Sequence, residues 1–273
     1  MERLSISQRS LQDLLPDSLT SSFCVSIPKN TQVWVVTGML VQYLESFTDS
    51  VVIRDGYDPI GLVGGIDIIE RVFKNPSSDF FYNTNVEDIM EKNFIIISKE
   101  TKLKELLNYW KQTRRAFAMI PNELQDYSAI SARKLLEIGL RCKSEMTISN
   151  LPKKKIATFR KDDTVRDIIN AMLENKTRKL LLENSSQFIN DRIIIEKIVE
   201  DLKYLHGIDY FLNMYAHTFN LEDATVISEN LTIPEISKIL FDMPHPYVIY
   251  EDQVISPWDI CLTLLSDDLT EYK

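Results

Sequence analysis

The sequence has few of the residues that build metal, redox or covalent catalytic centres. Its 273 residues include three cysteines and three histidines. The cysteines are far apart and form no C-x-x-C pair, which excludes a zinc knuckle and a dithiol redox motif. The histidines form no H-E-x-x-H motif, and no Ser/His/Asp or Cys/His order suggests a catalytic nucleophile. We therefore expect no enzyme activity, no metal site and thiols that stay reduced.

Phosphate loops, basic surfaces and membrane spans are also missing. The seven glycines form neither G-x-G-x-x-G nor G-x-x-x-x-G-K. A net charge of −9 argues against nucleic acid as a partner, and the three lysines at 153–155 are typical of a solvated connector. No stretch approaches the roughly 18 uninterrupted apolar residues of a membrane helix, and the first residues lack the apolar core of a signal peptide. We expect a soluble protein of the cytoplasm, with no membrane partner.

What the sequence does contain is a core-forming composition and an internal repeat. Hydrophobic residues make up 44% of the chain and charged residues 26%, as in ordinary globular proteins. A ten-residue segment recurs in which a β-like run leads directly into a helix. The four segments are GLVGGIDIIE from Gly61, SAISARKLLE from Ser128, QFINDRIIIE from Gln187 and QVISPWDICL from Gln253. Their starts are 67, 59 and 66 residues apart, so we number four copies of one repeat and ten positions in each segment.

Further elements are predicted ahead of each segment. Runs rich in β-branched, aromatic or aliphatic residues lie at 51–55, 117–120, 180–184 and 247–252. Apolar spacing of i, i+3 and i+4 before these runs predicts helices, for example from Val165, Ile168, Ile169 and Met172 in copy three. Another strand is expected before each helix, at 23–27, 94–98, 156–159 and 224–228. Each copy thus reads strand, helix, strand, strand, helix, and is so small that it needs a partner copy to bury its sheet.

This pattern resembles the CBS domain, which occurs in tandem pairs called Bateman modules. The resemblance covers roughly residues 12–268, and its most specific signals are the opening VEDIM from Val86 and a Gly-h-h-[Ser/Thr]-x-x-Asp signature, where h is hydrophobic. It implies an α+β fold of four CBS motifs, each β-α-β-β-α, packed as two Bateman pairs. We expect Bateman module 1, with motifs 1 and 2, at 1–140. Bateman module 2, with motifs 3 and 4 and a helical insert near 198–220, is expected at 141–273.

The strand-to-helix turn of each segment, which we call the signature turn, has the chemistry of a nucleotide site. A helix start offers free N–H groups to an anion. A Ser at position four can hydrogen-bond a phosphate, and an Asp at position seven can accept both hydroxyls of a ribose. Copy four has both residues, Ser256 and Asp259, whereas copy one has Asp67 but Gly64 at position four. The alternative is that these polar residues only begin their helices.

Many members of the resembling family bind AMP, ADP, ATP or S-adenosylmethionine in clefts between paired copies. By that resemblance, Val51 in copy one and Tyr247 in copy four would line adenine pockets. Ordinary core packing is the alternative for both residues, and it is the favoured one for Val51. Trp258, between the two polar positions of copy four, is expected to pack on a neighbouring helix rather than on a ligand.

Copies two and three carry basic residues at or near the signature turn, whereas copies one and four carry an Asp at position seven. Lys134 holds position seven in copy two, and Arg115 precedes the copy-two strand. Arg178 and Lys179 precede the second strand of copy three. A lysine cannot accept ribose hydroxyls, but these cations can face the phosphates of a nucleotide held by the paired copy. Each of them can also be a solvated helix-end charge.

Two functions remain open at this point. The first is a ligand sensor that binds an adenine nucleotide at the Asp67 turn and at the Ser256 and Asp259 turn, and signals occupancy by a shift between packings. Its basic residues would favour a phosphate ester over the cationic S-adenosylmethionine. The second is a ligand-free scaffold whose repeats have decayed. In both cases we expect a homodimer formed through CBS pairs, with a protein target that the sequence does not identify.

Overall fold

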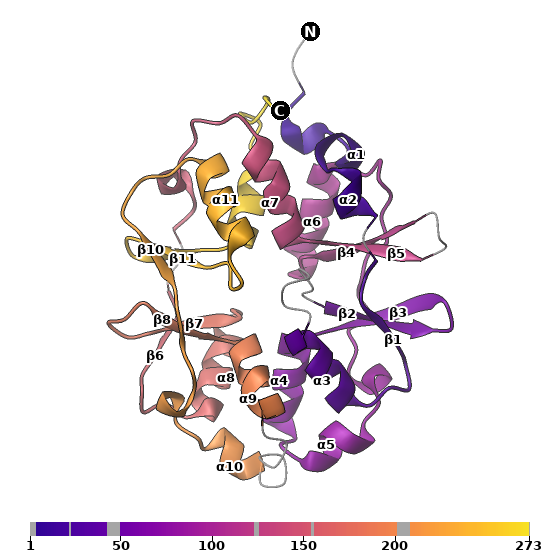
Figure 1. Cartoon of the computed structure of the whole chain (residues 1–273), viewed down its shortest axis with the longest axis vertical. Helices are drawn as coiled ribbons and strands as arrows, with labels where there is room; N and C mark the ends of the chain where they lie inside the picture. Colours follow the sequence, from indigo (N-terminus) through magenta and orange to yellow (C-terminus); the bar gives the residue numbers. More distant parts are fainter. Residues whose placement is uncertain are drawn as a thin grey trace. The chain divides into compact units, whose positions relative to one another are not determined.

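The structure, a computed structural model, describes residues 4–21, 23–42, 50–122, 126–153, 156–200 and 208–272. Contacts divide the chain into two units, each built from separate stretches of sequence. Unit 1 contains residues 1–24, 93–154 and 225–273, and unit 2 contains residues 25–92 and 155–224. Copies two and four therefore lie in unit 1, and copies one and three lie in unit 2 (Figure 1).

Copies one, three and four show the predicted order of elements, and copy two differs only in its first strand. Copy one consists of β1 (Ser26–Pro28), α3 (Val33–Gln42), β2 (Ser50–Asp55), β3 (Asp58–Gly64) and α4 (Gly65–Lys74). Copy two consists of a bridge from Ile96 to Met119 in place of its first strand, then α6 (Leu103–Thr113), β4 (Phe117–Pro121), β5 (Tyr127–Ser131) and α7 (Ala132–Arg141). Copy three consists of β6 (Thr158–Phe159), α8 (Val165–Glu174), β7 (Lys179–Leu182), β8 (Gln187–Asn190) and α9 (Asp191–Glu200). Copy four consists of β10 (Thr225–Ile227), α11 (Ile233–Asp242), β11 (Val248–Tyr250), β12 (Gln253–Ile255) and α12 (Pro257–Thr263).

The sheets are small and mixed, and each copy has its own. The middle and last strands of every copy pair antiparallel, while the first strand runs parallel to the middle one. In the described part of the chain, the strands of copies three and four belong to two separate sheets, β6-β7-β8-β9 and β10-β11-β12, where β9 is Glu222–Asp223. A single continuous parallel sheet across these copies is thus excluded, and the predicted α+β class is confirmed.

The helices form where the apolar spacing predicted them. Helix α8 buries Val165, Ile168, Ile169 and Met172, the four residues on which its prediction rested. Helix α6 buries an equivalent stripe that ends in Trp110, whose indole N–H donates to the Phe117 carbonyl over 3.1 Å. Such a stripe is the face that an amphipathic helix turns towards a core.

Each copy's opening segment packs on the first helix of another copy. These segments are α1 (Leu11–Leu14), η2 (Val86–Asp88), η3 (Ile148–Asn150) and η5 (Ala216–Thr218). The amide of Val33 in α3 donates to Thr84, just before η2, and Val86 donates back to Thr31, over 3.0 and 2.8 Å. The same two-bond pattern joins α1 to α6, η3 to α11 and η5 to α8.

Copies one and two each pack their opening segment on the first helix of the other, and copies three and four do the same. The opening of copy one lies in unit 1 with α6, and the opening of copy two lies in unit 2 with α3. Copies three and four exchange their openings in the same way. The predicted Bateman pairs join these same copies. The boundary at residue 140 stays a prediction, because the two units follow helix contacts and divide the chain differently.

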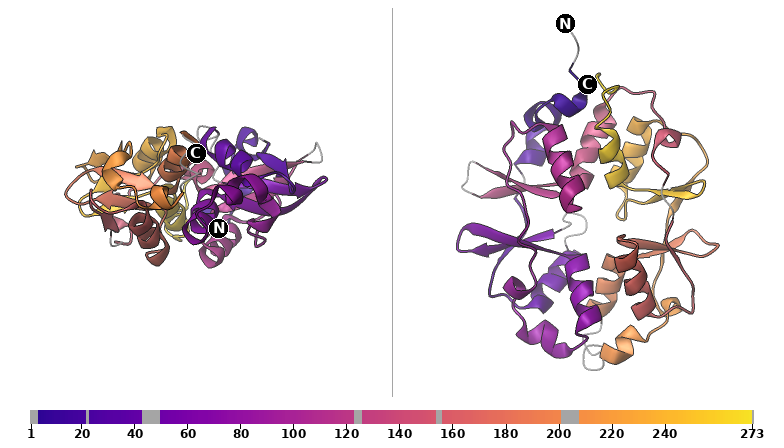
Figure 2. Two further views of the ribbon diagram at one scale, coloured as in Figure 1. Left: turned by 90° about the horizontal axis from the view of Figure 1, so that it is seen from below. Right: turned by 180° about the vertical axis from the view of Figure 1, so that it is seen from behind.

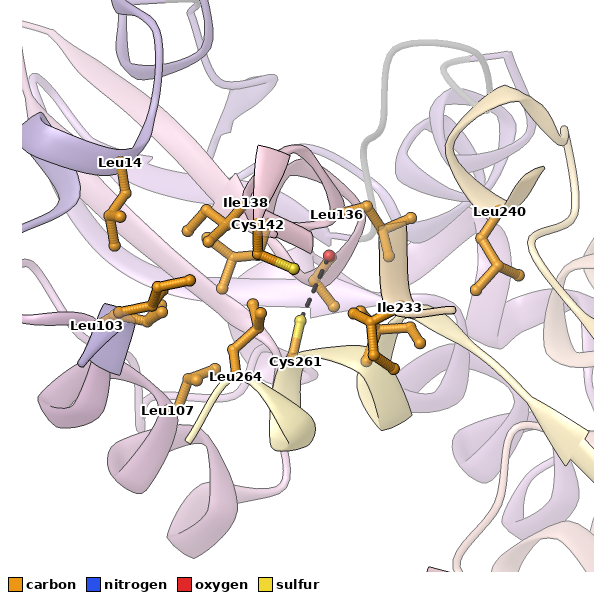
Figure 3. Close-up of a cluster of buried hydrophobic side chains, with 14 of the residues drawn as sticks. Leu14, Leu103, Leu107, Leu136, Ile138, Cys142, Ile233, Leu240, Cys261 and Leu264 are labelled. Carbon is orange, nitrogen blue, oxygen red and sulfur yellow. Dashed lines mark hydrogen bonds between the residues drawn. The ribbon is translucent and has the colours of Figure 1, made fainter. Parts of the chain in front are cut away.

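Unit 1 has one continuous core that joins copies two and four to the N-terminal segment. Helix α7 packs against α11 (Figure 1) and against α12, drawn in yellow beside it in the view from behind (Figure 2). Leucines and isoleucines from all of these elements meet around Cys261, whose thiol lies 3.5 Å from the Ala132 carbonyl (Figure 3). Cys24, Cys142 and Cys261 are all free thiols and buried, as expected for reduced cysteines.

In unit 2 the corresponding helices of copies one and three pack together, with α4 against α8 and α9 and α3 against α9. Beyond α9, the predicted insert contains α10 (Ile208–Leu212) and η5, while residues 201–207 of it lie outside the described residues. None of the helices that the structure describes is long and apolar enough to cross a membrane.

Candidate functional site

The four signature turns share one local geometry, a strand that ends directly at a helix start. Position four is the helix N-cap in copies one, two and four, occupied by Gly64, Ser131 and Ser256. In copy three the Asn190 side-chain carbonyl accepts from the amide of Ile193 over 2.8 Å. A polar residue at this position satisfies an amide that the helix itself leaves without a partner.

In copy four the predicted pair is brought together. The amide and the hydroxyl of Ser256 both donate to Oδ2 of Asp259, over 2.9 and 2.7 Å. Both side chains are buried, with residue exposures of 7% and 8%. The two residues form a capping box, in which the residue three positions into the helix binds back to the cap.

Copy one has the acidic half of the same arrangement. The amide of Gly64 donates to Oδ2 of Asp67 over 2.7 Å, and Asp67 is half-buried. No hydroxyl stands at position four here, so the carboxylate receives one cap hydrogen bond where Asp259 receives two. The expectation that copy four has the more complete turn agrees with this geometry.

The same capping box also occurs outside the signature turns. At the start of α8, the amide and hydroxyl of Thr164 donate to Oδ2 of Asp167 over 2.9 and 2.6 Å. These hydrogen bonds hold the pKa of Asp167 below its usual value. Helix capping is therefore sufficient to place an Asp at position seven. The ribose role of Asp67 and Asp259 stays a prediction.

Lys134 is not a solvated charge. It is only 5% exposed, and its ammonium donates to the carbonyls of Ala129 over 2.6 Å and Leu19 over 3.3 Å. Burial lowers its pKa to about 8. The side chain thereby holds α2 (Asp17–Thr20) against β5. The predicted phosphate contact would have to compete with these two carbonyls.

The basic residues near copies two and three differ in their surroundings. The Nε of Arg178 donates to Oδ2 of Asp191 over 2.8 Å, and Asp191 is almost fully buried. Lys179 is half-buried at the first position of β7, and Arg115 is half-buried just before β4. Among these predicted phosphate contacts, Arg178 forms an ion pair with Asp191.

The apolar candidates differ in exposure. Val51 is fully buried within β2, as its alternative interpretation as core requires. Tyr247 is half-buried directly before β11, one residue outside the last strand pair, Val248 with Ile255. Trp258 is half-buried and packs against the core of unit 1, as expected.

The predicted site residues fall into both units. Unit 1 contains Arg115, Lys134, Tyr247, Ser256 and Asp259. Unit 2 contains Val51, Asp67, Arg178 and Lys179. Among the residues that the structure describes, no group of three or more His, Cys, Asp or Glu side chains could hold a metal ion.

Sequence reasoning missed two arginines at position six. Arg133 at the start of α7 donates to the carbonyls of Phe241 over 3.1 Å and Pro244 over 3.3 Å, at the end of α11. Arg192 in α9 donates to the carbonyl of Leu40 near the end of α3. A cation at a helix C-terminus complements the carbonyls exposed there. The sequence does contain a pattern that could have identified them, because Arg stands at position six in the two copies that lack Asp at position seven.

Comparison with known proteins rests on structure alone, because no family model and no curated protein sequence matches this chain. MJ1225 of Methanocaldococcus jannaschii, described as "a putative archaeal homolog of g-AMPK", aligns with a TM-score of 0.73 and 15% identity. The alignment covers 90% of this chain and 98% of that one. With the fourfold β-α-β-β-α repeat, this likeness decides the fold. The chain has the tandem CBS fold.

An uncharacterized conserved protein of Pyrococcus horikoshii shares the fold, with a TM-score of 0.56 and 9% identity over 90% of this chain and 98% of its own. A CBS-domain protein of Agrobacterium tumefaciens aligns over 48% of this chain and 93% of its own, with a TM-score of 0.40 and 15% identity. At 15% and 9% identity, the likenesses to the M. jannaschii and P. horikoshii proteins show the fold alone.

Proposed function

We propose that this tandem CBS protein is a regulatory ligand sensor that binds an adenine nucleotide of the AMP, ADP or ATP type. The observation that carries the proposal is the buried Ser256–Asp259 pair, which places a hydroxyl and a carboxylate at a helix start. The likeness to MJ1225, described as "a putative archaeal homolog of g-AMPK", supports the same ligand class.

The capping box is compatible with this ligand. An ionised carboxylate has about four lone-pair sites, so one carboxylate can serve a helix cap and accept ribose hydroxyls as well. The cap also fixes the orientation of the carboxylate before a ligand arrives, which lowers the entropic cost of binding. Asp67 provides the same function in copy one with a single cap bond. Tyr247 would contact the adenine.

The phosphates would be bound by the basic residues Lys134, Arg115, Arg178 and Lys179. Their positive charge favours a phosphate ester and repels the sulfonium of S-adenosylmethionine. Binding should therefore weaken as salt screens these charges. We further propose that the protein acts in the cytoplasm by regulation rather than catalysis, as a homodimer whose target is a protein.

The test is isothermal titration of AMP, ADP, ATP and S-adenosylmethionine into the full chain. Asp259→Asn retains an oxygen for the cap but loses the charge, so binding at the copy-four turn should weaken at least tenfold, and Asp67→Asn should do the same at copy one. Asp167→Asn is the matched control, because it removes the same charge from a capping box outside the signature turns. If wild-type protein binds none of the four ligands, or if all three variants behave alike, the proposal is wrong.

One observation favours a second function, a ligand-free scaffold for dimerisation or partner docking. Both position-seven acids are engaged in helix caps, and copies two and three have Lys134 and Ile193 in that position. A scaffold would show no ligand-dependent thermal shift, whereas a sensor would be stabilised by its ligand. Thermal unfolding of the purified chain with and without AMP, ADP, ATP and S-adenosylmethionine separates the two functions.

A further inference from the structure

Arg178 and Asp191 are neighbours across the hairpin of copy three. Strand β7 begins at Lys179, which pairs with Asn190, so the residues just outside this pair face each other. The amide of Asp191 donates to the Arg178 carbonyl over 3.1 Å. Their side chains meet as well, with Nε of Arg178 donating to Oδ2 of Asp191 over 2.8 Å.

The ion pair runs from the interior to the surface. The side chain of Asp191 is 2% exposed, whereas the side chain of Arg178 is 44% exposed. A buried carboxylate requires a compensating positive charge, and the anchored Nε fixes the direction of the guanidinium. Arg178 is thus held at its inner end while its outer end reaches the surface.

Copy one contributes a third group to this pair. A Cβ added to Gly65 would lie 2.6 Å from Oδ2 of Asp191, so the carboxylate approaches the backbone where α4 begins. Asp191 is itself the first residue of α9. The partial positive charge at the starts of these two helices attracts a carboxylate. Gly65 also immediately follows Gly64, the N-cap that donates to Asp67.

The fold does not require this arrangement. In copy two the register pairs Phe117 with Ser131, so the residues that correspond to Arg178 and Asp191 are Ala116 and Ala132. Two alanines build the same strand-to-helix turn in unit 1. The charged pair is therefore an addition specific to unit 2.

We infer that Asp191 is a positioning residue that holds Arg178 for an anionic phosphate and ties it to the signature turn of copy one. This inference rests on the proposed function, because it assumes that Arg178 contacts the nucleotide. The phosphate contact of Arg178 would then depend on this carboxylate, whereas the ribose contact of Asp67 would not.

The experiment compares the affinities of AMP and adenosine, which differ only in the phosphate. Arg178→Gln and Asp191→Asn should each weaken AMP binding about tenfold, the loss of one charge-assisted hydrogen bond. Adenosine binding should stay unchanged in both variants. The double variant should lose no more than either single one, because both changes remove the same oriented guanidinium.

Gly65→Ala gives an independent route to the same effect. Its methyl group would displace the Asp191 carboxylate, so we expect the AMP affinity to fall about as far as in Asp191→Asn. Gly38→Ala is the control, because an added Cβ there meets nothing within 4 Å. Both variants replace a helical glycine in unit 2, and the control should bind AMP like the wild type.

The outcomes separate this inference from the proposed function. If wild-type protein binds neither AMP nor adenosine, the proposed function fails and the inference fails with it. If both ligands bind but the variants weaken them equally, Asp191 has only a structural role and the inference alone is wrong. The same holds if Arg178→Gln weakens AMP and Asp191→Asn does not.

Discussion

Units 1 and 2 join their two copies by the same kind of arginine contact but bury different charged side chains. In both, a position-six arginine of one copy caps a helix of the other, Arg133 in unit 1 and Arg192 in unit 2. Around the strand-to-helix turn they differ. Unit 2 contains the buried Asp191 with Arg178, whereas unit 1 has alanines there and buries Lys134 instead. The arginine caps common to both units stabilise the fold, whereas the buried Lys134 and Asp191 distinguish copy two from copy three.

The largest effect is expected from truncating the core of unit 1. Trp110→Ala removes a fully buried indole and its hydrogen bond to Phe117, which should lower the free energy of unfolding by about 3–5 kcal/mol. Met172→Ala makes the equivalent truncation in α8 of unit 2. Hydrogen exchange should show lost protection in α6 and α11 for the first variant and in α8 and α9 for the second. Equal loss throughout both units would mean that they unfold as one.

The buried charge of unit 1 predicts a pH dependence. Because the pKa of Lys134 is about 8 when folded and 10.5 ordinarily, the unfolded chain binds the proton more tightly, which costs up to about 3 kcal/mol at low pH. This cost falls as pH rises from about 8 towards 10.5. The difference in unfolding free energy between wild type and Lys134→Met should thus change by about 2 kcal/mol from pH 7 to about pH 9.5, in favour of the wild type.

Comparing the wild type with Lys134→Met cancels the contributions of other groups in unit 1 that titrate at alkaline pH. Burial raises the pKa of Cys142 to about 11 and that of Tyr272 to about 12, so their contributions fall with rising pH in both proteins. Ile193 occupies the position of Lys134 in copy three. Ile193→Met should show no such pH-dependent difference by urea denaturation, and finding one would refute the assignment to Lys134.

Helix contact within unit 1 can be tested at one glycine. A Cβ at Gly139 of α7 would meet the Ser237 hydroxyl of α11 and lie 3.1 Å from Cγ2 of Ile260 in α12. Gly139→Ala should therefore destabilise the protein by about 1–3 kcal/mol, against the helix propensity of alanine. Gly38→Ala in unit 2 has open space and should stabilise by up to about 1 kcal/mol. Similar melting temperatures for the two variants would contradict this packing.

The smallest effect concerns the caps of the first helices. Helix α8 begins with the Thr164–Asp167 capping box, whereas α6 has Lys102 at its N-cap and no side-chain hydrogen bond there, although Glu105 stands at the right spacing. Lys102→Thr should complete a box with Glu105 and stabilise by about 0.5–1 kcal/mol. Thr164→Lys should cost a similar amount, measured by urea unfolding. The Asp167 pKa is lowered, so its cap should weaken only as pH falls through that lowered value.

Local patterns predicted the elements well because the information is local. Apolar spacing located α6 and α8, and the recurring ten-residue segment located the turn at Ser256. Strand ends were less exact: the strand predicted at 224–228 is β10, Thr225–Ile227. The Asp at position seven was recognised from the sequence. A capping box and a ribose acceptor both need an Asp there, so the sequence alone could not decide between these two roles.

The partners of buried charges could not be predicted from local patterns. Arg178 was assigned to phosphate because it precedes a strand, yet its Nε binds a carboxylate thirteen residues later in the chain. Lys134 was assigned to phosphate because it holds position seven, yet its ammonium contacts Leu19, 115 residues earlier. Burial and hydrogen-bond partners depend on which segments fold back on each other, and no short window contains that information.

By itself, the sequence determined four copies of a β-α-β-β-α repeat, since hydrophobic periodicity and helix caps act within a few residues. It also determined which turns carry an acid and which carry a cation. Only the tertiary structure decided that the copies exchange their openings and that copies two and four share a core. Only it decided that Lys134 and Asp191 are buried, because the free energy of a charge depends on what packs around it.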